Sequence, residues 1–209
     1  FSLRVASQNF TLPEIEEGIE YAHKRGKKVY ITANIIPHNE DLEEFPSFVR
    51  QVSELGADAI IVSDLGMFSI AKEVAPNLEI HVSTQANNVN YVSANVWHSM
   101  GASRVVLARE LTFDEIKDIR KNIPDDLELE AFVHGSMCVS YSGRCMLSHH
   151  ITGRDANRGA CAQPCRWNFT LVEEKRPDMP LPIEQNEHGT FIMSSKDMCT
   201  IEHIPELIE

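Results

Sequence analysis

The sequence predicts an α/β fold of the (β/α) TIM-barrel type, incomplete in this chain and interrupted by a cysteine-rich segment. Short apolar runs begin near residues 28, 58, 79, 104 and 127, which is a spacing of 30, 21, 25 and 23 residues. Amphipathic stretches separate them, and nearly continuous apolar runs are typical of parallel strands covered by helices. An open doubly wound sheet shows the same alternation. The regular spacing suits a barrel, and no glycine-rich nucleotide loop follows any run.

Each element of this pattern has its own local signals. Thr11 and Glu14 have the spacing of a capping box at a helix start, and Gly26 is placed to end that helix. Thr112 and Glu115 repeat the starting signal for a helix that ends near residue 122. The other expected helices are Phe45–Leu55, Met67–Val74 and Val89–Met100. The expected strands are Lys28–Ile35, Asp58–Asp64, Glu79–Thr84, Arg104–Ala108 and Leu127–Val133.

These elements divide the chain into three parts. Residues 1–135 form a partial barrel, residues 136–168 a cysteine-rich segment without periodicity, and residues 169–209 a return to the barrel. In the last part we expect strands at Phe169–Glu174 and Phe191–Ser195, a polar loop at Pro177–Gly189 and a helix from Ile201 to Ile208. A complete barrel needs about 250 residues. Because the chain starts at Phe1 and stops at Glu209 inside that helix, we expect a piece of a longer protein.

Composition limits the functional classes. A chain of 209 residues with 43% apolar residues can bury one core, and its net charge of −12 argues against general binding of polyanions. No apolar run approaches the roughly 18 residues of a membrane span, and the N-terminus has no signal-peptide pattern. We therefore expect a cytoplasmic protein without a membrane segment.

Polar residues follow the expected strands at their carboxyl ends, where barrels carry their active sites. Together they predict a lined pocket, in which Asn34, Gln85, Asn87 and Arg109 bind substrate. For each residue alone, a helix cap or a loop hydrogen bond is an equal alternative. The residues that follow the ends of the expected strands are Asn34, Asp64, Thr84 to Asn88, Arg109 with Glu110, and His134 with Gly135.

Four of the five cysteines crowd into 28 residues. Cys138, Cys145, Cys161 and Cys165 are separated by 7, 16 and 4 residues. In a reducing cytosol such a group indicates a metal site rather than disulfides. Four thiolates suit an iron–sulfur cluster or a tetrahedral zinc, and buried or redox cysteines without metal are the third possibility. Cys199 is interpreted as a small apolar residue at a helix start, although an exchange with Cys165 stays open.

Basic residues gather in the same segment. Residues 134–168 contain Arg144, Arg154, Arg158 and Arg166 against Asp155, a net charge of +3 in a chain of −12. This contrast indicates an anionic substrate that meets the cysteine region. The alternative is that the arginines neutralise a thiolate cluster and brace loops.

The sequence resembles a known family in this segment. Residues 128–148, ELEAFVHGSMCVSYSGRCMLS, are similar to the signature of the collagenase-like peptidases of family U32, carried by Glu130, Phe132, Gly135, Ser136, Cys138, Gly143, Cys145 and Ser148. Residues 158–167, RGACAQPCRW, resemble the second cysteine pair of that family. The resemblance implies a (β/α) barrel that continues beyond both ends of this chain, and a [4Fe-4S] cluster held by Cys138, Cys145, Cys161 and Cys165.

The resemblance also implies three possible activities. One branch of the family is described as proteases, one hydroxylates RNA bases, and one hydroxylates ubiquinone precursors. The RNA branch includes a prephenate-dependent hydroxylation of a tRNA wobble uridine and a hydroxylation of a ribosomal RNA cytidine. The wording YSGRC and CAQPCRW is closest to that branch. We therefore expect tRNA and prephenate as partners, and a further domain in the full-length protein.

Site roles follow as hypotheses. His134 or Glu130 would act as the acid–base group and Tyr141, with Trp167, would stack on a flipped base. Arg109, Arg144, Arg158 and Arg166 would bind carboxylates or phosphates. The alternatives are that Glu130 pairs with an arginine and that the aromatic residues belong to the core.

Two other classes stay open. Proteolysis lacks a His-Glu-x-x-His or Gly-x-Ser-x-Gly motif here, and His149 and His150 are interpreted as loop residues. A zinc-stapled module that binds RNA or protein is the non-catalytic alternative.

Overall fold

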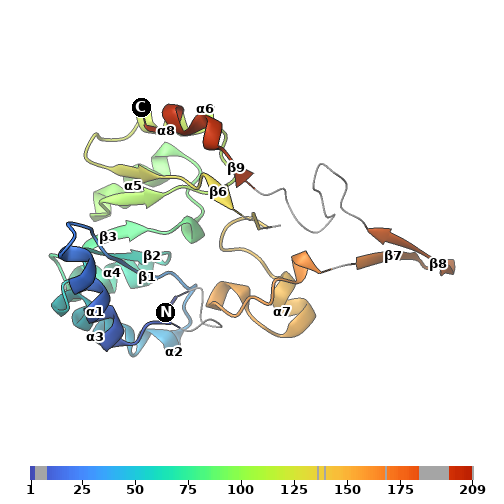
Figure 1. Cartoon of the computed structure of the whole chain (residues 1–209), viewed down its shortest axis with the longest axis horizontal. Coiled ribbons are helices and arrows are strands. Elements are labelled where there is room, and N and C mark those ends of the chain that lie inside the picture. The colour runs from blue at the N-terminus through green and yellow to red at the C-terminus, as the bar shows by residue number, and fades with distance from the viewer. Residues whose placement is uncertain (3–8, 136, 139, 168, 184–197, 209) are drawn as a thin grey trace.

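A five-stranded parallel sheet forms the centre of the protein (Figure 1). The computed structural model describes residues 1–2, 9–135, 137–138, 140–167, 169–183 and 198–208. The strands of the sheet are β1 (Tyr30–Ala33), β2 (Ala59–Val62), β3 (Glu79–Val82), β4 (Arg104–Val106) and β5 (Glu128–Glu130). Each lies inside a predicted run, so all five strand predictions are confirmed with shorter bounds.

Helices connect the strands. The predicted helices are confirmed to within two residues at their starts, and the capping boxes of Thr11 and Thr112 are both present. The four-residue helix α2 was not predicted. The helices are α1 (Leu12–His23), α2 (Asn39–Leu42), α3 (Phe45–Glu54), α4 (Leu65–Val74), α5 (Tyr91–Met100) and α6 (Phe113–Lys121).

The order of the strands distinguishes two ways of winding. The sheet runs β1-β2-β3-β4-β5 in sequence order, and every neighbouring pair is parallel. A doubly wound sheet reverses its order partway across, whereas a barrel adds each strand beside the previous one. The five strands therefore have the winding of a barrel. Closure into a complete barrel stays a prediction.

The hydrophobic core lies between one face of the sheet and the helices. Alternate strand residues face it, among them Ile60, Val82 and Leu107, which are at most 1% exposed. Phe45 of α3 and Phe68 of α4 are the largest fully buried side chains of this core. Burial of this apolar surface is the main favourable term in folding and fixes the strand register, because a one-residue slip would turn every strand over.

The opposite face of the sheet is polar. His81 of β3 is fully buried there, with its ring 4.7 Å from the ring of Tyr30. Arg104 of β4 pairs with Glu128, and its Nη1 donates to Glu130 Oε2 at 3.1 Å. Burial lowers the pKa of His81, and the positive charge of Arg104 lowers it further. Glu79 and Glu130 act in the opposite direction, and burial outweighs them, so the pKa of His81 stays below its ordinary value.

The cysteine-rich segment contains short elements that the sequence did not predict. They are α7 (Leu147–Thr152) and the 3₁₀ turns η2 (Ala156–Arg158) and η3 (Pro164–Arg166). Before it, β6 (His134–Gly135) pairs antiparallel with β9 (Met198–Cys199). The predicted strand Leu127–Val133 thus ends at residue 130, and His134 belongs to a separate two-stranded sheet.

The remainder of the chain differs from the prediction in one place. The strand expected at Phe169–Glu174 is β7 (Phe169–Glu173). The loop expected at Pro177–Gly189 is wrong over its first part, because β8 (Arg176–Ile183) pairs with β7 as an antiparallel hairpin that projects from the body (Figure 1). A lone hairpin has only edge strands, which tolerate proline. The expected strand Phe191–Ser195 and the motif residue Ser136 lie outside the described residues.

The chain ends with η4 (Ile201–His203) and α8 (Ile204–Ile208), where the sequence predicts one helix. None of the helices in the described ranges is long and apolar enough to cross a membrane.

Replacing His81 with Leu should flatten the pH dependence of stability. A histidine whose pKa is lower in the folded state stabilises the fold fully above its unfolded pKa, about 6.5, and that contribution is lost as the pH falls below it. Between about pH 7 and about pH 5 the wild type should therefore lose more free energy of unfolding than His81→Leu. Urea titrations at each pH measure this, and parallel pH curves would contradict it.

Candidate functional site

One loop joins the cysteine-rich segment to the carboxyl ends of β3 and β4. Its centre is Ser142, which is 1% exposed. Arg109, which follows β4, donates from Nη2 to Ser142 Oγ at 3.0 Å, and the Ser142 amide donates to Glu110 Oε1 at 3.1 Å. The Thr84 hydroxyl, after β3, lies 3.5 Å from the same Ser142 oxygen. Polar residues after two strands thus hold the loop.

Gly143 allows the loop to approach the sheet this closely. A Cβ atom there would lie 2.2 Å from the Gln85 carbonyl oxygen, and the φ angle is +74°. Both facts exclude a side chain at this position without rearrangement. Gly143 therefore allows the loop to pack directly against the backbone of Gln85.

Donors reach two of the four clustered thiols. Arg109 Nη1 lies 3.2 Å from Cys138 Sγ, and the Gln163 amide lies 3.3 Å from Cys161 Sγ. The Arg109 guanidinium is also 5.9 Å from the centre of the Phe132 ring. Hydrogen-bond donors and positive charge stabilise thiolate over thiol. Both sulfurs therefore accept a hydrogen bond from the protein.

All four thiols lie within electrostatic reach of one another. Burial raises the pKa of the Cys165 thiol, Arg166 opposes this, and the charges of Cys138, Cys161 and Cys145 raise it further. In the described part of the chain, no three His, Cys, Asp or Glu side chains are close enough to share a single metal ion. The four sulfurs are therefore neighbours, but they are spread more widely than the ligands of one ion.

Internal contacts brace the segment that carries these cysteines. Ser148 of α7 is fully buried, and its hydroxyl accepts from the Ala162 amide at 2.9 Å. Arg166 Nη2 donates to the Met137 carbonyl oxygen at 2.9 Å. These bonds connect the stretch that contains Cys161 to the stretches that contain Cys138 and Cys145.

A second set of contacts ties the segment to α2. Arg158 Nη2 donates to Glu40 at 2.8 Å and to Asp41 at 2.9 Å. Burial raises the pKa of Asp41, but hydrogen bonds from the His38 amide and from Arg158 hold it below its usual value. Asn157 contributes through its backbone carbonyl, which accepts from the Ile36 amide at 2.8 Å.

The structure therefore corrects the predicted role of Arg158. Its guanidinium was expected to bind substrate, and it is instead occupied by two carboxylates of α2. Arg166 and Arg109 are likewise engaged with protein atoms, at Met137 and at Ser142 and Cys138. For these three residues the alternative interpretation, bracing of loops and thiolates, is the one that the geometry supports.

The residues predicted to line a pocket after the first strands have structural contacts. Asn34 Nδ2 donates to Ser83 Oγ at 3.2 Å. Asn87 adopts a left-handed conformation with φ of 54° at the end of η1 (Thr84–Ala86), and Gln85 contacts Gly143 through its backbone. Asp64 caps α4 by accepting from the Met67 amide. Substrate binding by Asn34, Gln85 and Asn87 stays a prediction.

The three predicted catalytic residues are not brought together. Glu130 pairs with Arg104 on the polar face of the sheet, as its alternative interpretation proposed. His134 is exposed on β6, and Tyr141 is 60% exposed beside Ser142. Trp167 is 44% exposed, so the interpretation of Tyr141 and Trp167 as core aromatics is wrong.

Two further interpretations need correction. Cys199 is exposed on β9 opposite His134, so it is not a buried residue at a helix start. His149 and His150 lie on α7 rather than in a loop. Both rings are exposed. The short elements that place these three residues depend on contacts distant in sequence, which a local pattern does not report.

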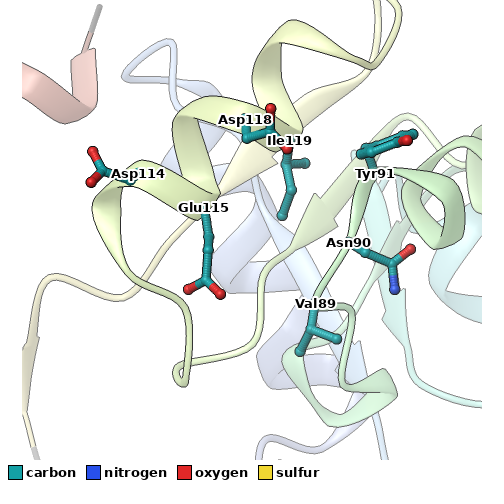
Figure 2. A pocket seen from close by; sticks show the side chains of 7 residues that line it. All are labelled: Val89, Asn90, Tyr91, Asp114, Glu115, Asp118 and Ile119. Carbon is teal, nitrogen blue, oxygen red and sulfur yellow. The ribbon is translucent and has the colours of Figure 1, made fainter.

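Two cavities differ in charge. One of about 320 Å³ lies between α6 and the start of α5, and three carboxylates line it (Figure 2). The other, of about 520 Å³, lies beside Cys145 and is lined by Arg144, His149 and His150, with no acidic residue. Only the second belongs to the cysteine-rich segment.

The fold and this segment define a class of protein, an α/β domain with barrel-like winding that carries four clustered thiols at the carboxyl edge of its sheet. The model of Peptidase family U32 matches residues 1–209. The chain belongs to that family.

Comparison with known proteins agrees. The chain is 38% identical to tRNA hydroxylation protein P of Escherichia coli K12 over 99% of the chain and 54% of that protein. It is 41% identical to tRNA hydroxylation protein P1 of Bacillus subtilis 168 over 100% of the chain and 49% of that protein. A 23S rRNA 5-hydroxycytidine synthase of Escherichia coli K12 is 38% identical over 95% of the chain and 29% of that protein. The chain thus spans about half the length of the first two relatives.

A solved structure shares the fold. The U32 peptidase Mk0906 aligns with a TM-score of 0.54 at 18% identity, over 65% of this chain and 57% of that one. At this identity the likeness concerns the fold alone.

The close approach at Gly143 can be tested with a matched glycine. Gly153 has a similar φ of +70° but open space around it. Gly153→Ala should therefore cost only the left-handed backbone, about 1 kcal/mol, while Gly143→Ala adds about 1–3 kcal/mol for the clash with Gln85. Chemical denaturation measures both. Alkylation of Cys138 and Cys145 in metal-free protein should accelerate only in Gly143→Ala, and equal effects of the two variants would contradict the docking contact.

Proposed function

We propose that this protein is an iron–sulfur-dependent enzyme that hydroxylates an RNA base, with a tRNA wobble uridine as its substrate. The observation that carries the proposal is the bracing of the four-cysteine segment, in which Arg109 holds Ser142 and Cys138, and Arg166 and Ser148 join the stretches that carry the other cysteines. The names of the relatives from Escherichia coli and Bacillus subtilis support RNA hydroxylation.

The residues fit a [4Fe-4S] cluster better than zinc. Four cysteine thiolates are the usual ligands of such a cluster, and they bind its separate iron atoms. A structural zinc gathers four ligands around one ion, whereas the described residues offer no three such groups at that distance. Cys138 and Cys161 accept hydrogen bonds at sulfur, which is common for the ligands of such clusters. We therefore assign Cys138, Cys145, Cys161 and Cys165 as the ligands.

When bound, the cluster supplies one-electron transfer. The protein residues around it hold the segment and the substrate. Arg109 stabilises the Cys138 thiolate, and the exposed rings of Tyr141 and Trp167 offer surfaces on which a base that has left its stack can lie.

Proton transfer falls to His134 in this proposal. Glu130 is the less suitable candidate because its carboxylate pairs with Arg104. His134 is exposed four residues before Cys138, so its ring nitrogens are accessible to a substrate at the cluster.

Replacing C–H with C–OH is a two-electron oxidation, which requires an electron acceptor and an oxygen donor from outside the chain. We retain prephenate as the proposed small-molecule co-substrate. A further domain of the full-length protein is also part of the proposal, and it would supply basic surface that this chain, at −12, lacks.

Proteolysis is the second candidate, and one observation favours it. Cys145, His149 and His150 line the same cavity, which is the composition of a thiolate–imidazole pair. An archaeal relative, 44% identical over the whole chain, is also named an uncharacterized protease. Cleavage that survives loss of the cluster but not Cys145→Ala would establish this alternative.

The first test is the spectrum and metal content of the protein purified without oxygen. We expect a brown protein with broad absorption near 400 nm and about four irons per chain. Cys138→Ala or Cys161→Ala should lose the cluster, and Cys199→Ala should keep it, because Cys199 lies on β9. RNA mass spectrometry of a deletion strain should show hydroxyuridine restored by the wild type and by Cys199→Ala alone. A colourless zinc protein would contradict the proposal.

The second test concerns the donor to Cys138. Arg109→Gln should lower the reduction potential, because loss of a positive donor destabilises the more negative reduced cluster. A shift of about 60 mV corresponds to a tenfold change in a one-electron equilibrium. Redox titration followed by electron paramagnetic resonance measures it. Arg154→Gln is the control, since it removes the same charge from the segment while its own contact is with the Ala160 carbonyl. Equal shifts of the reduction potential in both variants would contradict a specific effect of the hydrogen bond from Arg109 to Cys138.

A further inference from the structure

The cavity beside Cys145 has the composition of an anion site. It encloses about 520 Å³ and is lined by Arg144, His149 and His150, with Met146 at its edge. No Asp or Glu belongs to its lining, although the chain carries a net charge of −12. The cavity at α6 is acidic instead, with Asp114 and Asp118 among its lining residues (Figure 2).

Arg144 differs from the other arginines of the segment. Arg154 donates to the Ala160 carbonyl oxygen, Arg158 to Glu40 and Asp41, and Arg166 to the Met137 carbonyl oxygen. Within the described ranges, the Arg144 guanidinium has no hydrogen-bond or ion-pair partner, and neither do the rings of His149 and His150. The positive charge of the segment is thus used internally except at this cavity.

We propose that this cavity binds a backbone phosphate of the RNA substrate, next to the nucleotide that is modified; the inference rests on the proposed function. A guanidinium binds two phosphate oxygens at once, and the imidazole N–H groups add donors. Met146, 65% exposed, offers apolar surface to the adjoining sugar or base.

The exposure of the lining favours a polymer over a small molecule. Arg144, Met146, His149 and His150 are all exposed. Sites for small ligands bury most of the ligand against a largely enclosed wall. An RNA chain covers an open site by itself and spreads its contacts over several phosphates and stacked bases. Tyr141 is exposed three residues before Arg144, which places a stacking ring close in sequence to the phosphate contact.

The experiment measures RNA affinity at several salt concentrations. The full-length protein, which includes the further domain proposed above, is prepared anaerobically and titrated with an unmodified tRNA transcript that carries a wobble uridine. Arg144→Gln should weaken binding about tenfold, as expected for loss of a charged hydrogen bond. It should also reduce the slope of log K against log salt by about 0.7–0.9, the loss of one phosphate contact.

Arg50→Gln is the matched control. Arg50 is exposed on α3, outside the cysteine-rich segment, and its loss changes the net charge by the same amount. We expect wild-type affinity and slope for it. Thermal melting of both variants should match the wild type, since neither guanidinium has a hydrogen-bond or ion-pair partner in the part of the chain that the structure describes. If Arg144→Gln fails to fold, His149→Gln with His150→Gln provides the second test, and the loss of these donors should weaken binding of the transcript at every salt concentration.

The outcomes separate the two claims. A wild type that binds the transcript, with a slope that Arg144→Gln leaves unchanged, overturns the phosphate contact alone. A wild type that does not bind the transcript overturns both the proposed function and this contact. Malonate is the third arm, followed by the ring signals of His149 and His150 in nuclear magnetic resonance. Saturation by malonate that depends on Arg144, together with an unchanged RNA slope, would assign the cavity to a small carboxylate and overturn the RNA assignment.

Discussion

The site depends on the burial of one small polar residue, Ser142, against the carboxyl edge of the sheet. Its hydroxyl accepts from Arg109 and its amide donates to Glu110, so both polar groups are satisfied while the residue is 1% exposed. An unsatisfied buried amide would cost about 1–3 kcal/mol, so the loop has a strong reason to adopt one register. The arginine that fixes this register also donates to Cys138. Loop position and thiolate environment are therefore set by the same side chain.

The two faces of the sheet differ in polarity and in their structural role. One face is apolar and is covered by helices, and this face fixes the strand register. The other carries His81 and Arg104, and the charge of Arg104 is balanced by Glu128 and Glu130. Because the Glu130 carboxylate pairs with Arg104, we give the acid–base role to His134 in the proposed function. A residue that lies in the family motif thus has a structural partner, and the chemical role moves to residues of the segment.

Local sequence rules predicted the sheet well and the segment poorly, for a physical reason. Each strand from β1 to β5 contributes apolar residues to the covered face and is therefore visible in an apolar run. Thr112 with Glu115 marks a helix start because a capping box is local. The β6–β9 pair is only two residues long and joins positions more than 60 apart, so no local pattern reports it. Gly143 was visible as a motif glycine, but its reason, the approach to the Gln85 carbonyl, is tertiary.

The charge of the cysteine-rich segment could likewise be predicted only as a total. Composition alone gives the cysteine-rich segment a net charge of +3, and it does not say which arginine is available. The partner of each guanidinium decides that. Arg158 is neutralised by two carboxylates of α2, which lie more than 100 residues away in sequence. Because most of these guanidinium groups have protein partners, few positively charged side chains of the segment remain available to a ligand. Under the proposed function, an acidic chain would meet RNA at a small basic area, and the specificity of that contact would rest on the cysteine edge and its exposed aromatic rings.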